Sequence, residues 1–89
     1  MNIWDGISEF VVVVDTGSFS AAAKRLGVST TYVSCQVAAL EGRLGIRLLA
    51  RSTRKVRMTE AGTEYYRRCS ELVAGLEEAN QLDSKYHIV

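Results

Sequence analysis

Hydrophobic residues recur at helical spacing from the start of the chain. In the first segment every third or fourth position is apolar, at Trp4, Ile7, Val11 and Val14. This spacing predicts a helix over about residues 3–15 with one face toward the core. Four consecutive valines would also fit a buried strand. We favour the helix because the period begins before the valines and Gly17 follows as a C-terminal stop.

Two further helices are predicted next, joined by a short turn that contains glycine. Ser18 is the expected N-cap of the first, because its hydroxyl can accept a hydrogen bond from a free amide of the first turn. The inward positions of that helix are Phe19, Ala22, Ala23 and Leu26. Ser29 is the expected cap of the next helix. The inward positions there are Val33, Val37, Leu40 and Leu44. Gly27 ends the one helix and Gly45 the other, which predicts a helix-turn-helix.

Short apolar runs at residues 46–50 and 56–58 indicate a two-stranded hairpin. The residues between the runs are rich in positive charge, so the hairpin has a basic tip. In this position after a helix-turn-helix, such a hairpin is a wing. The predicted fold class is therefore mainly α: a winged helix-turn-helix of three helices and a two-stranded β wing over residues 1–58, followed by a long helix.

The long helix is predicted over residues 59–84, with Thr59 as its N-cap. Its apolar stripe consists of Tyr65, Cys69, Leu72, Leu76 and Ala79. At ~1.5 Å per residue the helix would be ~37 Å long, which exceeds the small core beneath it. The stripe must therefore find a partner outside that core. Trp4 is expected to fill the core between the first helix and this one, and residues 85–89 form a tail without a clear pattern.

Composition narrows the class of protein. With 89 residues, 47% hydrophobic and 24% charged, the chain suits one small soluble domain. The longest apolar run, residues 10–14, is far shorter than the ~20 residues of a membrane span, so we expect a cytoplasmic protein with no membrane partner. Two cysteines and one histidine supply too few ligands for a disulfide framework or a zinc site. We expect no metal and no cofactor.

Positive charge is concentrated in one segment of the chain. The net charge is only +1, but six of the 11 basic residues lie within residues 42–58, where no acidic residue occurs. They are Arg43, Arg47, Arg51, Arg54, Lys55 and Arg57. Such a segment suits a polyanion such as nucleic acid, although a solvated charged face would have the same composition.

The outward face of the third helix, residues 30–44, carries small side chains. At ~100° per residue the positions opposite its apolar stripe are Thr31, Cys35, Ala38 and Gly42, with Tyr32 and Ser34 beside them. Exposed helix faces usually carry Lys and Glu. Small and hydroxylic side chains let a helix approach closely, either in the major groove of DNA or against another protein. The basic hairpin that follows favours the groove.

Several spaced motifs occur in one order along residues 1–80. They are SFSAAA at 18–23, Leu26, Ser29, Ser34, Gln36, Leu40-Glu41, Leu44-Gly45, Leu48-Leu49, Arg51 and TEAG at 59–62. Together they closely resemble the amino-terminal domain of LysR-type transcriptional regulators. The resemblance implies a winged helix-turn-helix, followed by a linker helix that forms an antiparallel homodimer contact. It also implies a bacterial regulator that binds imperfect inverted-repeat promoter DNA, with the third helix in the major groove and the wing on phosphate or in the minor groove.

The resemblance further implies which residues contact DNA or a second subunit. The DNA-binding candidates lie at the start of the second helix, on the third helix and in the wing: Ser18, Ser20, Ser29, Thr30, Thr31, Tyr32, Ser34, Cys35, Gln36, Arg51, Thr53, Arg54 and Lys55. The dimerisation candidates are the five residues of the long helix's stripe. Two features depart from the family's usual pattern. Thr30-Thr31 stand where Gln-Pro or Gln-Ser is frequent, and Cys35 stands where a basic residue is common, which affects base preference and not the fold.

The sequence also allows interpretations other than a complete regulator of this family. Family members normally continue into an effector-binding domain, whereas this sequence stops at Val89, as a fragment or a naturally short member would; we expect no small-molecule effector site in it. An alternative function is a short interaction protein that dimerises with full-length relatives and antagonises their DNA binding. We do not expect an enzyme, because Cys35 would need a base as partner and the only histidine, His87, lies at the far end of the linker helix. Glu41 is expected to be a helix-surface or ion-pairing residue.

Overall fold

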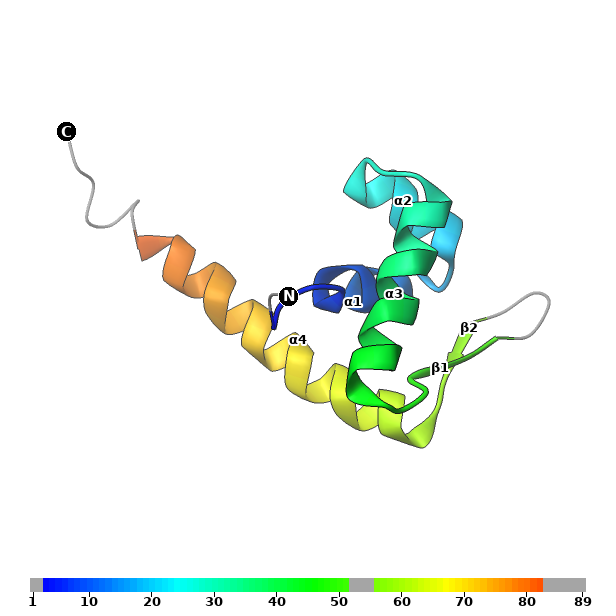
Figure 1. Cartoon of the computed structure of the whole chain (residues 1–89). Helices are drawn as coiled ribbons and strands as arrows, with labels where there is room; N and C mark the ends of the chain where they lie inside the picture. The colour runs from blue at the N-terminus through cyan, green and yellow to red at the C-terminus, as the bar shows by residue number, and fades with distance from the viewer. Residues whose placement is uncertain (1–2, 52–55, 83–89) are drawn as a thin grey trace.

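The computed structural model describes residues 3–51 and 56–82 and has the predicted mainly α architecture, a winged helix-turn-helix. Over these residues the elements are α1 (Ile7–Thr16), α2 (Phe19–Leu26), α3 (Thr30–Leu44), β1 (Leu49–Arg51), β2 (Val56–Met58) and α4 (Glu60–Asn80). Helices α1, α2 and α3 pack together, the hairpin extends from one side, and α4 projects from the other as a long rod (Figure 1). The strands are antiparallel, with Leu49 opposite Met58 and Arg51 opposite Val56.

Three polar side chains begin three of the helices, and all three were predicted. The hydroxyl of Ser18 accepts from the amide of Ala21 at 2.9 Å at the start of α2. Ser29 does the same for Tyr32 at 3.0 Å at the start of α3. Thr59 caps α4 by accepting from the amide of Gly62 at 2.9 Å. Each cap satisfies an amide that has no partner within its own helix.

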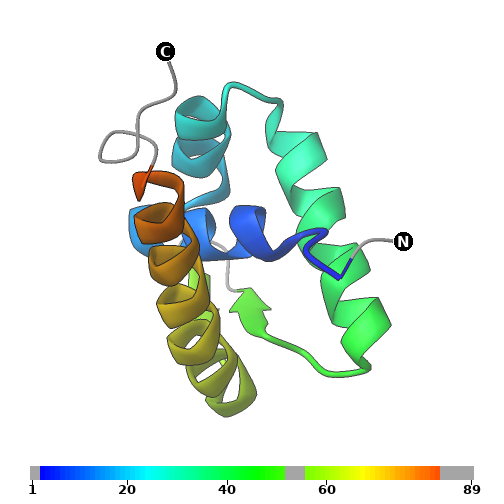
Figure 2. The same ribbon diagram turned by 90° about the vertical axis from the view of Figure 1, so that its left-hand side faces the viewer.

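The core lies where α1 meets the other helices and β2, and Leu49 of β1 is part of it. Its largest fully buried side chains are Phe10, Val13, Val33, Val37, Leu40, Leu48 and Leu49. Figure 2 shows α1 between α4 on one side and α3 on the other. The inward stripe predicted for α3 is therefore confirmed for its first three members, whereas Leu44 at the end of the helix is 37% exposed.

Two element boundaries differ from the prediction at the sequence level. Helix α1 begins at Ile7, because residues 3–6 form a turn and Gly6 has a left-handed backbone with φ 85°. Trp4 consequently lies off the end of the helix and is 44% exposed, so the prediction that it fills the core is wrong. The first strand begins at Leu49 and not at Ile46, which is 44% exposed before the chain turns into the core.

The end of α4 falls close to the predicted one. The helix runs to Asn80, while residues 83–89, which include the predicted end at 84 and the tail, lie outside the described residues. None of the helices in the described part of the chain has the length and apolar character that a membrane span requires.

Candidate nucleic-acid interface

The outward face of α3 is exposed as the helical wheel predicted. Thr31, Cys35, Ala38 and Gly42 are all exposed to solvent. On the opposite side of the same helix Val33 and Val37 have no exposed surface. The small side chains therefore form a slim outer surface that a groove or another macromolecule can approach.

The other predicted contact residues of α2 and α3 lie around this surface. Thr30 and Tyr32 are exposed, the latter by 46%, and Ser34 and Gln36 are half-buried at its edges. Ser29 is exposed while its hydroxyl caps α3. At the start of α2, the Ser18 and Ser20 hydroxyl oxygens are 3.2 Å apart. These side chains present hydroxyl and amide groups, which bond to phosphates or base edges.

The basic tip of the wing is described only in part. Thr53, Arg54 and Lys55 lie outside the described residues, as does the side chain of Arg51. Among the basic residues that are described, Arg57 on β2 is exposed and stands opposite Ala50. Arg47 before β1 has 69% of its side chain exposed. Both carry their positive charge on the surface near the hairpin.

Unlike Arg47 and Arg57, Arg43 makes hydrogen bonds to backbone carbonyl groups within the described part of the chain. One of its terminal nitrogens donates to the carbonyl oxygen of Asp5 at 2.8 Å and contacts that of Ile3 at 3.5 Å. These bonds tie the last turn of α3 to the turn that precedes α1. The side chain therefore holds the N-terminal segment in place, although in the sequence it is indistinguishable from the other residues of the basic segment.

Of the two roles expected for Glu41, the surface position is wrong because the residue is buried, whereas ion pairing agrees with its contact to Arg47. Glu41 is 8% exposed, and its Oε2 accepts from the amides of Leu48 at 2.7 Å and Leu49 at 3.0 Å. Its other oxygen lies 4.0 Å from the guanidinium of Arg47. A buried carboxylate is tolerated when it is hydrogen-bonded, and here two backbone donors meet that need.

The predicted dimerisation stripe divides into two parts along α4. Cys69 is 4% exposed and belongs to the core, and Tyr65 is half-buried with its ring centroid 5.9 Å from that of Phe10. These two residues pack against the core within the chain. Leu72 and Leu76 are 57% and 50% exposed, and Ala79 is exposed as well. Burial also raises the pKa of the Cys69 thiol.

Polar contacts fix α4 against α1 and along its own surface. The hydroxyl of Tyr66 donates to the carboxylate of Asp15, and this hydrogen bond raises the pKa of the phenol. On α4 itself, Glu64 accepts from Arg67 at 2.8 Å and from Arg68 at 3.1 Å, and these bonds lower the pKa of the Glu64 carboxyl group. The direction of α4 relative to the core is thus held by more than apolar contact.

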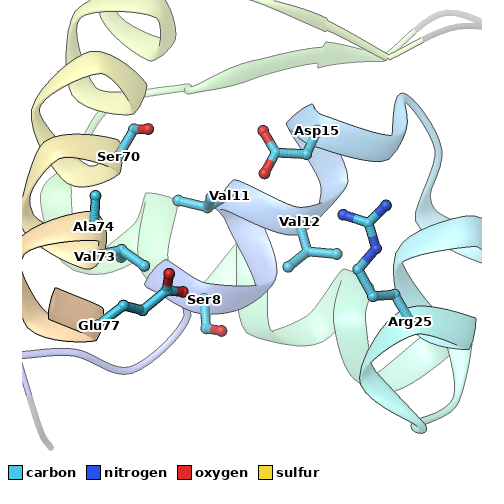
Figure 3. Close-up of a pocket in the computed structure, with 9 residues that line it drawn as sticks. All are labelled: Ser8, Val11, Val12, Asp15, Arg25, Ser70, Val73, Ala74 and Glu77. Carbon is cyan, nitrogen blue, oxygen red and sulfur yellow. The ribbon is translucent and has the colours of Figure 1, made fainter. Parts of the chain in front are cut away.

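An open groove of about 350 Å³ lies between α1 and α4 (Figure 3). Ser70, Ala74 and Glu77 extend from α4 on one side, and Asp15 and Arg25 lie on the other, with valine side chains between the two. None of these lining residues pairs a nucleophile with a base. Within residues 3–51 and 56–82, no cluster of three His, Cys, Asp or Glu side chains could hold a metal ion.

Comparison with known proteins places this arrangement among bacterial regulators. The family described as "Bacterial regulatory helix-turn-helix protein, lysR family" matches residues 4–63. An "HTH-type transcriptional regulator" of Xanthomonas campestris pv. campestris (strain 8004) is 53% identical over 70 residues, which make up 79% of this chain and 20% of that protein. The chain thus spans about a fifth of that relative's length, and it spans 28% of another from Haemophilus influenzae.

Solved structures share the fold over nearly the whole chain. BenM DBD in its complex with catB site 1 DNA has a TM-score of 0.85 and 31% identity, and the match covers 91% of both chains. CbnR DBD in a complex with DNA has a TM-score of 0.81 and 30% identity, and the match covers 93% of this chain and 95% of that one.

Proposed function

Because this chain belongs to the LysR family of bacterial regulatory helix-turn-helix proteins, we propose that it binds duplex promoter DNA and regulates transcription. The Xanthomonas relative is a transcriptional regulator, and both similar complexes contain DNA, which supports this proposal. The alternative of a short protein that only antagonises full-length relatives is not favoured by these comparisons. A regulator of this kind acts on DNA in the cytoplasm, and its role is not that of an enzyme.

The observation that carries the proposal is the outer face of α3. Thr31, Cys35, Ala38 and Gly42 leave this face slim, and the major groove is wide enough to admit an α-helix. Ser34 and Gln36 flank the face with a hydroxyl and an amide. In this proposal α3 is the recognition helix, residues 30–44, and the side chains at its N-terminal end reach base edges.

The wing supplies the contacts to the DNA backbone. Arg51, Arg54 and Lys55 lie in the segment of the chain that concentrates positive charge, and the exposed Arg47 and Arg57 belong to the same segment. Contacts to phosphate fix the orientation of a protein on the duplex without reading its sequence. The two elements therefore divide the work: α3 specifies bases and the wing adds affinity.

The protein works as a homodimer on an inverted repeat. Leu72, Leu76 and Ala79 are exposed on α4, and a second copy of this helix running antiparallel would cover them. Two-fold symmetry in the protein then matches two-fold symmetry in the promoter. Under this proposal residues 1–58 read DNA, residues 59–84 form the linker helix, and no small-molecule effector or cofactor binds this part of the chain.

The test is the salt dependence of DNA binding. If about four phosphates are neutralised per protomer, a dimer should show a slope on the order of −7 in a plot of the logarithm of the binding constant against the logarithm of salt concentration. The measurement is a titration of a labelled inverted-repeat duplex by fluorescence anisotropy at several salt concentrations. A slope near zero, or no binding at low salt, would refute the proposal.

A further inference from the structure

The short segment Arg47–Leu49, which connects α3 to the wing, is held by its backbone from two sides. From α3, the buried carboxylate of Glu41 accepts from the amides of Leu48 and Leu49 at 2.7 Å and 3.0 Å. Both amides belong to residues with no exposed surface. A single carboxylate oxygen of Glu41 therefore fixes the path of the backbone after the recognition helix.

The start of α4 holds the same segment from the other side. The amide of Thr59 donates to the carbonyl oxygen of Leu48 at 3.0 Å, and its hydroxyl donates to that of Arg47 at 2.6 Å. Gly62 lies still closer: a Cβ atom built on it would stand 1.9 Å from the carbonyl oxygen of Leu48. Since real Cβ atoms essentially never approach closer than 3.0 Å, only glycine allows the first turn of α4 to rest on this carbonyl.

These contacts join the recognition helix to the dimerisation helix at one point. Helix α1 also packs against both, mainly through apolar side chains, and the hydroxyl of Tyr66 on α4 donates to the carboxylate of Asp15 on α1. The hydrogen bonds from Glu41 and Thr59 are directional, and the approach at Gly62 is steric. Together with the contacts of α1, the junction therefore constrains the angle at which α4 leaves the DNA-binding unit.

We propose that Glu41, Thr59 and Gly62 are positioning residues that set the spacing between the two half-sites read by the dimer. The inference rests on the proposed function, since it concerns how two recognition helices are placed on DNA. A small rotation at the junction produces a large displacement at the far end of α3. Turning α3 by about 10° moves a point about 20 Å away by about 3.5 Å, which is close to the 3.4 Å rise of one base pair. A small change at the junction should thus change which spacing fits.

The main experiment compares Gly62→Ala with Gly75→Ala. Both replace a glycine of α4, but within the single chain a Cβ atom at Gly75 has nothing within 4 Å, so this variant is the matched control once sedimentation shows that it still dimerises. The probes are synthetic duplexes whose half-site is taken from the sequences that the wild-type chain enriches from a random pool. One probe carries a single half-site, and a series carries inverted repeats in which the spacer grows by one base pair at a time.

A second pair of variants guards against misfolding of Gly62→Ala. Thr59→Val removes the hydroxyl that contacts Arg47 and caps α4 while keeping the side-chain shape, and Thr59→Ser restores the hydroxyl. Circular dichroism and sedimentation establish that each variant used is folded and dimeric. The serine variant should behave as the wild type does if hydrogen bonding at the junction is what matters.

We expect Gly62→Ala and Thr59→Val to bind the single half-site within about twofold of wild type, and the wild type's preferred inverted repeat at least about tenfold more weakly, with the optimum moved to another spacing. Gly75→Ala and Thr59→Ser should keep the wild-type optimum. Equal losses on half-site and inverted repeat, or an unchanged optimum in folded variants, would overturn the inference alone. If the wild type binds none of these duplexes, the proposed function fails and the inference fails with it.

Discussion

Replacing Leu76 by aspartate should convert the dimer to a monomer while leaving the fold of each chain intact. Leu76 lies on α4 at a groove that Trp4 and Ile7 also line, and it is 50% exposed in the single chain. It is not among the core residues, so a charge at this position does not have to be buried within the protomer. The same charge in a dimer would face its symmetry copy across the seam between the two helices.

The size of the effect follows from the exposed surface of this side chain. Full burial of a leucine is worth about 1.5–3 kcal/mol, so covering the exposed half of Leu76 contributes about 1 kcal/mol. Two-fold symmetry applies this loss twice, and each aspartate adds a desolvation cost of at least about 1 kcal/mol. The total of about 4 kcal/mol corresponds to about a thousandfold weaker dimerisation.

Trp4 provides a direct readout of this change. It is the single tryptophan of the chain, it is 44% exposed, and it lines an apolar groove together with Leu76 and Val73. A second subunit on this face should move the tryptophan emission to shorter wavelength as the protein concentration rises. Leu76→Asp should show no such shift, and sedimentation should give the mass of a monomer.

The control is Glu78→Lys, which changes a charge on the same helix at ~200° around the axis from Leu76. This variant should remain dimeric. A wild-type protein that is monomeric at tens of micromolar would refute the dimer, and a Leu76→Asp variant that dimerises as well as the wild type would show that the contact lies on another face.

The remaining predictions concern DNA contacts and thiols. Cys35→Arg should tighten binding to a family-type inverted repeat by about tenfold or more compared with Cys35→Ser, because arginine can bond bidentately where a thiol is a weak donor; equal affinities in anisotropy titrations would disprove that orientation of α3. Arg54→Ala should weaken binding to cognate and random duplexes alike, whereas Ser34→Ala should mainly change discrimination between them by ~1–3 kcal/mol, which competition titrations distinguish. In the native protein a thiol reagent should label the exposed Cys35 and spare the buried Cys69, whose thiol pKa is raised; labelling of both before unfolding, measured by mass spectrometry, would contradict the burial.

The local features of this fold could be predicted from the sequence because they depend on neighbouring residues. Ser18, Ser29 and Thr59 cap the helices they were assigned to, since a cap needs only its own side chain and the amides of the next turn. The outward face of α3 followed from periodicity in the same way. This face is exposed because the valines on the opposite side of the same helix are buried in the core.

Features that depend on contacts between distant segments could not be predicted in the same way. In the sequence Gly62 looks like an ordinary helix glycine. Glycine is required there because the carbonyl of Leu48, fourteen residues earlier in the chain, leaves no room for a Cβ atom. In the sequence Glu41 looks like a charged residue on a helix surface. Its burial is explained by hydrogen bonds from two backbone amides, which only the turn after α3 brings near. Trp4 fits the apolar stripe, but it lies outside the helix, because α1 begins only after Gly6 with its left-handed backbone.

One correction could have been made from length alone. The stripe of α4 is continuous in sequence, yet Cys69 is in the core while Leu72 is 57% exposed. Helix α1 has 10 residues and spans ~15 Å, whereas the 21 residues of α4 span ~32 Å. A helix of that size cannot cover the whole stripe, so Tyr65 and Cys69 pack within the chain while Leu72, Leu76 and Ala79 stay exposed.

The position of Arg43 sets a limit on the electrostatics of binding. Six basic residues lie within residues 42–58, but the guanidinium of Arg43 is bonded to the carbonyl of Asp5 on the N-terminal turn. Five cations per protomer then remain for phosphates, so a dimer should not exceed a salt slope of about −9, while four contacts per protomer give about −7. A steeper slope would require cations from outside this segment, such as Lys24 and Arg25 at the end of α2. The measured slope therefore indicates how many residues bind the DNA backbone and also whether α2 contributes to it.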